Sequence, residues 1–317
     1  MGKPRIFLTG ASGMVGRNIL EHPNSSQYEI IAPGSKELNL TNFLETKKFI
    51  LETRPDIVIH SAGRVGGIQA NIAHPINFLV TNIDLGRNVI LGSFEAGVPR
   101  LINLASSCMY PRNGVNPLSE SQVLQGELEP TNEGYAIAKI FATRLCEYIN
   151  RENEQLKASV IRYKTLIPCN LYGRYDKFEP QHSHLIPAII KKIHQAKLLN
   201  LSEIEIWGDG TARREFMYAG DFADAVLCAV KNFENLPDLI NIGLGCDYSI
   251  DEYYEIAAKV IGWKGKFFHN TTKPVGMKQK LVDITLQRKW NWMPKYSLNI
   301  GIEEAYKYYL KEKKNEL

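Results

Sequence analysis

The chain has 317 residues, of which 44% are hydrophobic and 23% are charged. This composition is typical of a soluble globular protein and excludes collagen-like, mucin-like and mostly disordered chains. The formal net charge is only +4, which is too small an excess on this length to indicate a nucleic-acid partner.

The cysteines and the hydropathy of the chain indicate the cellular compartment in which the protein acts. The five cysteines are scattered and form no C-x-x-C pair, so the sequence predicts a reduced, cytoplasmic protein without a metal site. No apolar stretch reaches the roughly 18 residues of a membrane span. The N-terminus also lacks the apolar region of a secretory signal. We therefore expect no membrane partner.

The first third of the chain alternates strands with helices. Apolar runs predict strands at residues 5–9, 28–32, 56–60 and 101–105. Helical patterns separate them at residues 13–22, at 42–53 and from Pro75 to about residue 97. This alternation predicts a doubly wound α/β fold, in which helices cover both faces of a parallel sheet.

The pattern loosens after about residue 170. The sequence predicts a helix at 134–151, a β-rich run at 159–167, a helix at 185–197, a strand at 203–207 and a terminal helix at 300–314. No internal repeat or low-complexity linker is visible. We therefore expect a nucleotide-binding Rossmann domain over residues 1–170 and a second region over 171–317 that interleaves with it.

A glycine-rich motif, Gly10-Ala11-Ser12-Gly13-Met14-Val15-Gly16, follows the first strand and opens a helix. Glycines there allow a tight turn and the close approach of a pyrophosphate to the helix N-terminus. The motif predicts a bound dinucleotide, and the alternative is a purely structural turn.

The turn after the second strand bears on the choice of dinucleotide. It reads Pro33-Gly34-Ser35-Lys36 and offers no Asp or Glu to bind the adenosine ribose of NAD. A hydroxyl and a cation suit a 2′-phosphate, which favours NADP(H). The alternative is that Lys36 is a solvated loop lysine.

Tyr135 and Lys139 lie four residues apart on one face of a predicted helix. A nearby ammonium is expected to lower the pKa of the phenol toward the range in which it exchanges a proton. Ser106 follows the fourth strand. The Y-x-x-x-K spacing alone is a weak signal, with a solvated helix face as the alternative, but its combination with Ser106 and the glycine turn is a strong signal of a site.

This combination resembles the extended short-chain dehydrogenase/reductase family, which acts on nucleotide sugars, and within it the GDP-L-fucose synthases. The stretches that carry the resemblance are HSAGRVGGIQAN, SSCMYP, LEPTNEGYAIAK, PCNLYGRYDKF, SHLIPAII, WGDGTARREF and KLVD. They run from residue 60 to residue 283, so the resemblance covers most of the chain.

The resemblance implies roles for five residues. Tyr135 would protonate the C4 oxygen of a sugar, Lys139 would bind the nicotinamide ribose, and Ser106 would hydrogen-bond the C4 carbonyl. Cys108 and His184 would exchange protons at C3 and C5. From the residues alone, Cys108 is equally a small packing residue and His184 a satisfied loop histidine.

The residues and the resemblance together give two binding sets. The cofactor set is Gly10, Ser12, Gly13, Met14, Val15, Gly16, Ser35, Lys36, Ala62, Gly63, Lys139, Pro168 and Asn170. The substrate set is Asn170, His184, Trp207, Arg214 and Lys280. Arginine suits a diphosphate through its two-pronged donor geometry, whereas Trp207 could instead fill core.

The implied function is NADPH-dependent reduction of the C4 ketone of a GDP-4-keto sugar by a cytoplasmic homodimer that serves surface glycan synthesis, with 3,5-epimerisation left open. One alternative is a reductase without epimerase activity that acts on a GDP-4-keto-heptose, because the runs REFMYAGD and KPVGMKQKLVD depart from the family pattern. Others are a nucleotide-sugar 4-epimerase or dehydratase that retains NAD(H), and a non-catalytic NADP-binding sensor.

Overall fold

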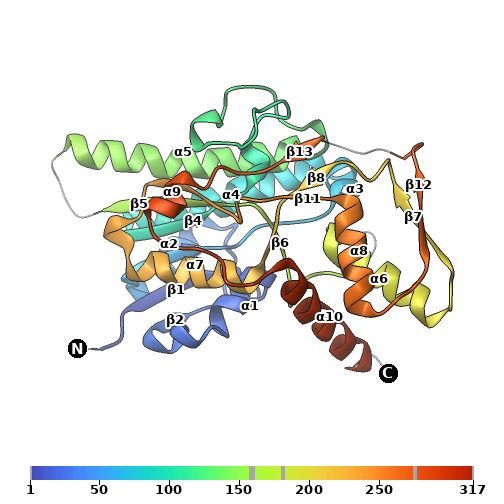
Figure 1. Cartoon of the computed structure of the whole chain (residues 1–317). Coiled ribbons are helices and arrows are strands. Elements are labelled where there is room, and N and C mark those ends of the chain that lie inside the picture. The colour runs from blue at the N-terminus through green and yellow to red at the C-terminus, as the bar shows by residue number, and fades with distance from the viewer. Residues whose placement is uncertain (1, 157–160, 180–182, 274–276, 316–317) are drawn as a thin grey trace.

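The computed structural model describes residues 2–156, 161–179, 183–273 and 277–315 (Figure 1). Within these ranges no helix combines the length and apolarity that a membrane crossing requires. A large parallel sheet with helices on both faces occupies one side of the molecule, and the helices at residues 185–198, 250–261 and 298–315 lie on the other (Figure 1).

Six strands form the large sheet: β1 (Arg5–Thr9), β2 (Glu29–Ile31), β3 (Ile57–His60), β4 (Arg100–Leu104), β5 (Arg162–Pro168) and β10 (Leu239–Ile242). Their spatial order is β10-β5-β4-β3-β1-β2, and every neighbouring pair is parallel. This order reverses direction beside β1, which confirms the predicted doubly wound fold.

Five helices cover the sheet: α1 (Met14–Leu20), α2 (Phe43–Thr53), α4 (Pro75–Glu95), α5 (Glu133–Gln155) and α7 (Ala219–Lys231). Helices α2 and α5 each pack on α4, while α1 packs on α7 (Figure 1). Successive residues of a strand face opposite sides of the sheet. Phe7 packs on the side of α2, α4 and α5, whereas its neighbours Ile6 and Leu8 belong to the core that includes α7.

The second region has its own core between α6 (Leu185–Leu198), α8 (Ile250–Ile261) and α10 (Leu298–Asn315). Beside them lie three small sheets. Their strands are β7 (Glu203–Trp207) with β12 (Lys266–Asn270), β11 (Tyr248–Ser249) with β8 (Arg213–Arg214) and β13 (Gln279–Lys280), and β6 (Asn170–Tyr172) with β9 (Phe216–Tyr218).

The remaining elements are short. They are the helices α3 (Ile68–Ala73) and α9 (Thr285–Lys289) and the 3-10 turns η1 (Pro23–Gln27), η2 (Ser107–Met109), η3 (Glu120–Gln122), η4 (Pro130–Asn132) and η5 (Phe233–Asn235).

The expected elements agree with the structure to within a few residues, and one difference has a physical cause. A short helix that was not predicted, α3, precedes the helix expected from Pro75. It is too short to show the helical repeat of apolar residues on which a sequence-based prediction depends. The predicted β-rich run at 159–167 begins at residues 159–160, which lie outside the described residues, and β5 covers its remainder. The chain returns to the large sheet after residue 170 through α7 and β10, and the division at residue 170 itself stays a prediction.

Candidate active site

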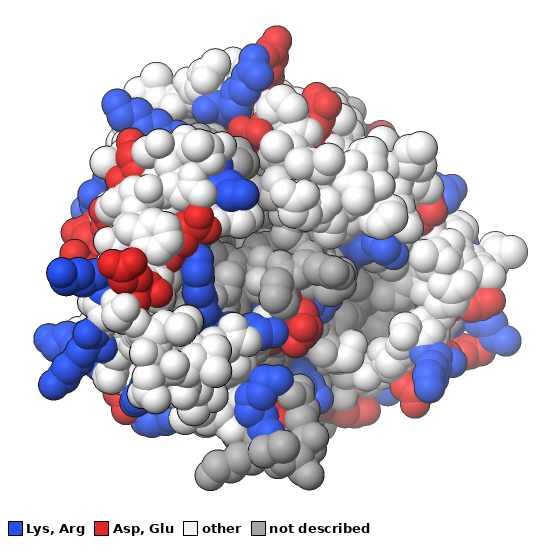
Figure 2. Space-filling model, turned by 90° about the vertical axis from the view of Figure 1, so that its right-hand side faces the viewer, with Lys and Arg blue, Asp and Glu red and all other residues white. Residues whose placement is uncertain are grey.

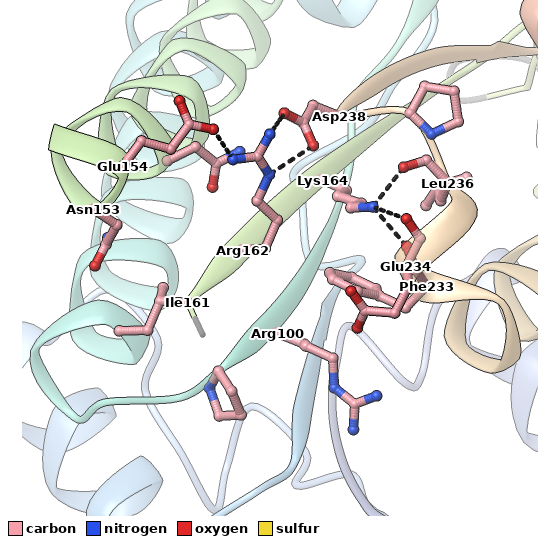
Figure 3. A pocket seen from close by; sticks show the side chains of 13 residues that line it. Arg100, Asn153, Glu154, Ile161, Arg162, Lys164, Phe233, Glu234, Leu236 and Asp238 are labelled. Atoms are coloured by element: carbon pink, nitrogen blue, oxygen red, sulfur yellow. Dashed lines mark hydrogen bonds and ion pairs between the residues drawn. The ribbon is translucent and has the colours of Figure 1, made fainter. Parts of the chain in front are cut away.

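Two regions of the large sheet could hold a ligand, and their charges distinguish them. A hollow of about 760 Å³ opens at the amino-terminal ends of β4 and β5 (Figure 3). Arg162 pairs there with Asp238 and Glu154, and Lys164 donates to the carbonyl of Phe233 at 2.6 Å. Protein groups thus satisfy these cations, and in such sheets ligands bind beyond the opposite, carboxyl ends of the strands.

At the carboxyl ends, the turn after β1 meets the loop after β3. Gly10 has φ +70°, and a Cβ on it would lie 2.7 Å from the Cα of Ala62. A Cβ on Gly16 would lie 2.3 Å from the Gly10 carbonyl oxygen, whereas Gly13 is exposed. The first glycine therefore permits the turn, the second leaves its backbone open and the third allows α1 to approach β1, which are the roles of a dinucleotide-binding turn.

The turn after β2 carries one residue that the sequence argument missed. Ser35 and Lys36 are exposed there, as contact with a bound cofactor requires. The Glu37 carboxylate folds back and accepts a hydrogen bond from the Gly34 backbone N–H at 2.7 Å. An acid three residues after a turn glycine was the signal that could have identified it. A negative charge therefore lies on this turn beside the Lys36 cation.

Helix α5 places Tyr135 and Lys139 under the end of β4. The Lys139 ammonium donates to the Leu104 carbonyl at 2.7 Å and lies 5.8 Å from the centre of the Tyr135 ring. Ser106, which follows β4 and caps η2, hydrogen-bonds toward the Tyr135 phenol. The structure thus brings together the three residues expected for ketone reduction.

The expected direction of the Tyr135 pKa is wrong. Burial raises this pKa well above its usual range, Cys108 adds to the rise, and the Ser106 hydrogen bond opposes it. Burial also lowers the pKa of Lys139 to about 8, and its ammonium points at a carbonyl rather than at the phenol. The phenol therefore stays protonated, which suits a proton donor.

Cys108 and His184 approach the same place from η2 and from the start of α6. Burial raises the pKa of the Cys108 thiol, an effect that the Lys280 ammonium opposes. Burial lowers the pKa of the His184 imidazole, and Lys177 and Lys280 lower it further. The Lys280 charge thus acts on both groups, and the directions of the two pKa shifts leave both uncharged near neutral pH.

Two cations of the expected substrate set lie on paired strands. Arg214 of β8 is in register with Lys280 of β13, and burial lowers the pKa of both side chains. The Glu129 carboxylate opposes that shift in each case. Neighbouring Arg213 instead pairs with Asp247 at 2.7 Å. The strand pairing therefore presents two half-buried positive charges side by side.

The other expected residues occupy more peripheral places. Trp207 is 51% exposed, which rules out core filling, and its indole donates to Glu205 at 3.0 Å. It lies on β7, in a different small sheet from Arg214. Pro168 ends β5, and the Asn170 amide donates to the Glu215 carbonyl at 2.9 Å. On the face shown in Figure 2, Lys and Arg side chains are interspersed with Asp and Glu side chains.

Sequence reasoning missed two residues, Asn82 and Tyr175, that help to fix the backbone around the site. The buried Asn82 of α4 accepts from the Arg64 N–H at 2.8 Å and donates to its carbonyl at 3.1 Å, which holds the loop after β3. Tyr175 adopts φ +68°, a left-handed conformation that is strained for an aromatic residue, with the Arg17 guanidinium 4.6 Å from its ring centre. Within the described ranges no three His, Cys, Asp or Glu side chains are grouped as metal ligands would be.

Comparisons with known proteins agree with this geometry. The family described as "NAD dependent epimerase/dehydratase family" matches residues 6–243. GDP-L-colitose synthase of Yersinia pseudotuberculosis is 51% identical and covers 98% of this chain and 100% of its own length. GDP-L-fucose synthase of Azorhizobium caulinodans is 49% identical, with 98% of each chain covered.

A solved structure agrees as well. A GDP-mannoheptose C4 reductase from Campylobacter jejuni with NADP bound superposes with a TM-score of 0.86 at 30% identity, over 98% of this chain and 99% of that one. The glycine turn, the Ser106–Tyr135–Lys139 group and these matches lead to one conclusion: the chain belongs to the NAD dependent epimerase/dehydratase family, among the GDP-L-fucose and GDP-L-colitose synthases.

Proposed function

We propose that this protein is an enzyme that uses NADPH to reduce the C4 ketone of a GDP-4-keto sugar. The observation that carries the proposal is the group at the end of β4, where Lys139 is anchored 5.8 Å from the Tyr135 ring and Ser106 hydrogen-bonds toward the phenol. The solved relative that binds NADP and the relatives named for GDP-linked sugars support it.

The residues present fit the cofactor. The exposed backbone at Gly13 is open to a pyrophosphate, and the Lys139 ammonium faces the place where a nicotinamide ribose would lie in this fold. When bound there, NADPH supplies a hydride. The Lys36 side chain would face the adenosine 2′-phosphate, with Glu37 opposing it.

The protein's own part in the reduction is orientation and proton transfer. Ser106 holds the C4 carbonyl oxygen by a hydrogen bond, so that negative charge developing on this oxygen meets a fixed donor. Tyr135 then gives its proton to the same oxygen, which completes the C4 alcohol and leaves a phenolate beside the Lys139 ammonium. The raised phenol pKa keeps that proton in place until the oxygen becomes basic.

The diphosphate of the substrate would lie between Arg214 and Lys280. Both cations are half-buried and lie in register on neighbouring strands. Partial burial strengthens their attraction to an anion, because less water screens it. Trp207 would contact the nucleotide from its exposed position on β7.

Epimerisation at C3 and C5 is a second candidate activity. It is favoured by the position of Lys280, whose charge acts on both Cys108 and His184. The Lys280 ammonium opposes the rise that burial causes in the Cys108 pKa, and the thiolate is the form that can remove a proton acidified by the C4 ketone. A neighbouring imidazole could return a proton on the opposite face of the sugar.

We also propose a cytoplasmic homodimer. Exposed apolar side chains line the outer surface of α3 and α4, with Ile68 at 56%, Ile72 at 54%, Ile76 at 76% and Val80 at 49% exposure. A surface of this kind is typical of an interface, and in a symmetric dimer the same patch meets itself. Light scattering that finds a monomer at every concentration would contradict this assignment.

Loss of NADPH absorbance with a panel of GDP-4-keto-6-deoxyhexoses and GDP-4-keto-heptoses tests the main proposal. We expect turnover with at least one of them. A protein that is purified with tightly held NAD(H) and consumes no NADPH would instead be an epimerase or dehydratase. A protein that binds NADP but converts none of the sugars would be a sensor. Turnover with heptoses alone would identify the reductase-only alternative.

A further inference from the structure

Glu215 is a fully buried acid beside the expected substrate cations. It lies between β8 and β9 with 0% of its surface exposed. Its Oε1 accepts hydrogen bonds from the backbone N–H groups of Leu244 at 2.6 Å and Gly245 at 2.9 Å. Its Oε2 accepts from the N–H of Val282 at 2.9 Å. The carboxylate therefore joins two segments that are far apart in the chain.

The turn after β10 is shaped around this carboxylate. Two successive backbone N–H groups converge on one oxygen, and Gly245 adopts the left-handed φ of +73° that such an anion-binding turn uses. A Cβ on Gly243 would lie 2.5 Å from the same oxygen, so only glycine fits there. The turn therefore fits the Glu215 carboxylate closely, with two N–H donors on one oxygen and no room for a side chain at Gly243.

The same residue adjoins both cations. Glu215 directly follows Arg214 in the chain, and Val282, whose N–H it binds, lies two residues after Lys280. Its own carbonyl receives the Asn170 amide at 2.9 Å. The Glu215 side chain therefore binds the backbone next to Lys280, while the Glu215 backbone continues from Arg214 and accepts from the Asn170 side chain.

We propose that Glu215 is a positioning residue that sets the spacing of Arg214 and Lys280 for the diphosphate of the substrate. This inference rests on the proposed function, because it assumes that these two cations bind a nucleoside diphosphate. Full burial keeps Glu215 itself away from the ligand. A buried carboxylate is costly unless hydrogen bonds compensate it, and here they compensate it by holding the end of β13 against β8.

The variant Glu215→Gln tests the inference with little change of shape. Its amide oxygen can still accept from Leu244 and Gly245, but its NH₂ group then faces the Val282 N–H and releases the end of β13. We expect the Kd for GDP, measured by calorimetry, and the KM for the GDP-4-keto sugar to rise about tenfold, or about 1.4 kcal/mol. We expect kcat at saturation and the Kd for NADPH to stay within about threefold.

Asn150→Asp is the matched control. Asn150 is also buried and binds both backbone groups of Tyr163, at 2.7 Å and 2.8 Å, but at the amino-terminal end of β5. In this variant a carboxylate oxygen replaces the Asn150 NH₂ group and faces the Tyr163 carbonyl oxygen. We expect a lower Tm with unchanged affinity for GDP, which separates general destabilisation from a change in the substrate cations.

A third variant, Arg214→Ala, separates this inference from the proposed function. If Arg214→Ala weakens GDP binding and Glu215→Gln does not, the positioning role is overturned while the diphosphate site stands. If neither variant changes GDP binding, the diphosphate site itself is wrong. Should Glu215→Gln fail to fold, Glu215→Asp keeps the charge but is one methylene shorter, and an unchanged affinity for GDP in that variant would likewise overturn the role.

Discussion

The cofactor half and the substrate half of this molecule are built in different ways. Around the glycine turn the functional positions lie within one strand–turn–helix unit, so that Gly10 and Gly16 pack on each other six residues apart. Around Arg214 the positions come from strands β8 and β13, which are separated by more than sixty residues and joined through Glu215. The first half depends on local backbone geometry, and the second depends on contacts between residues far apart in the chain.

The named relatives include synthases of two different GDP-linked sugars, colitose and fucose. The glycine turn tolerates little change, because a Cβ on Gly10 or Gly16 would collide with backbone atoms. The proposed substrate cations instead lie beside Glu215, whose carboxylate binds backbone groups that are distant in the chain.

Tyr135→Phe should have the largest effect on turnover. It removes the proton donor and keeps the ring, and loss of general acid catalysis typically lowers kcat by roughly 10²–10⁴-fold. Affinity for NADPH should be nearly unchanged, since the Lys139 anchor on Leu104 does not involve the phenol. Steady-state kinetics and a cofactor titration measure both quantities, and turnover like that of the wild type would contradict the assigned role.

Arg214→Ala should affect the substrate half alone. A hydrogen bond to a charged group contributes about 1.5–3 kcal/mol, so the KM for the GDP sugar should rise by roughly 10–100-fold while NADPH binding is unchanged. Arg213→Ala is the control, because the Arg213 guanidinium forms an ion pair with Asp247, whereas Arg214 is the residue in register with Lys280. Equal effects of the two substitutions would show that the substrate cations were assigned to the wrong arginine.

Cys108→Ser should separate the two candidate chemistries. If epimerisation is native, this variant consumes NADPH with GDP-4-keto-6-deoxymannose and yields an unepimerised product, because Ser106, Tyr135 and Lys139 remain. Wild type in D₂O without NADPH should then incorporate deuterium at C3 and C5, which mass spectrometry and NMR detect. Uptake no greater than in an enzyme-free control, together with reduction of a pre-epimerised sugar, would leave Cys108 and His184 as substrate-positioning residues.

The smallest expected effect is on cofactor choice at the turn after β2. NADPH should bind more tightly than NADH, and Lys36→Glu should narrow or reverse that preference by removing the only cation in residues 33–37. Glu37→Gln should widen it severalfold, because the carboxylate on this turn opposes a 2′-phosphate. Fluorescence titration with both cofactors measures the ratio, and equal affinities in the wild type would show that this turn does not read the phosphate.

The sequence was sufficient for much of the cofactor half and for little of the substrate half. The alternation of strands and helices, the glycine turn and the Tyr135–Lys139 spacing are local patterns, and the structure shows each of them. Glu215 could not be found in this way, because its partners Leu244 and Val282 lie 29 and 67 residues away in the chain.

The direction of the Tyr135 pKa failed for a related reason. Helical spacing correctly predicts a nearby ammonium, but it contains no information on burial. Burial around the phenol comes from tertiary packing and raises its pKa, while the Lys139 ammonium is directed to the Leu104 carbonyl. Asn82 was missed likewise, because its two bonds to Arg64 cross 18 residues.

Transfer of deuterium tests the central claim most directly. The enzyme is incubated with a GDP-4-keto sugar and NADPH that carries deuterium at both nicotinamide C4 positions, and the product is analysed by NMR. The account predicts one deuterium at C4 of the sugar for each NADPH consumed, and loss of this transfer in Tyr135→Phe. A product without deuterium at C4, formed while NADPH is not consumed, would contradict it and identify an epimerase or dehydratase with retained NAD(H).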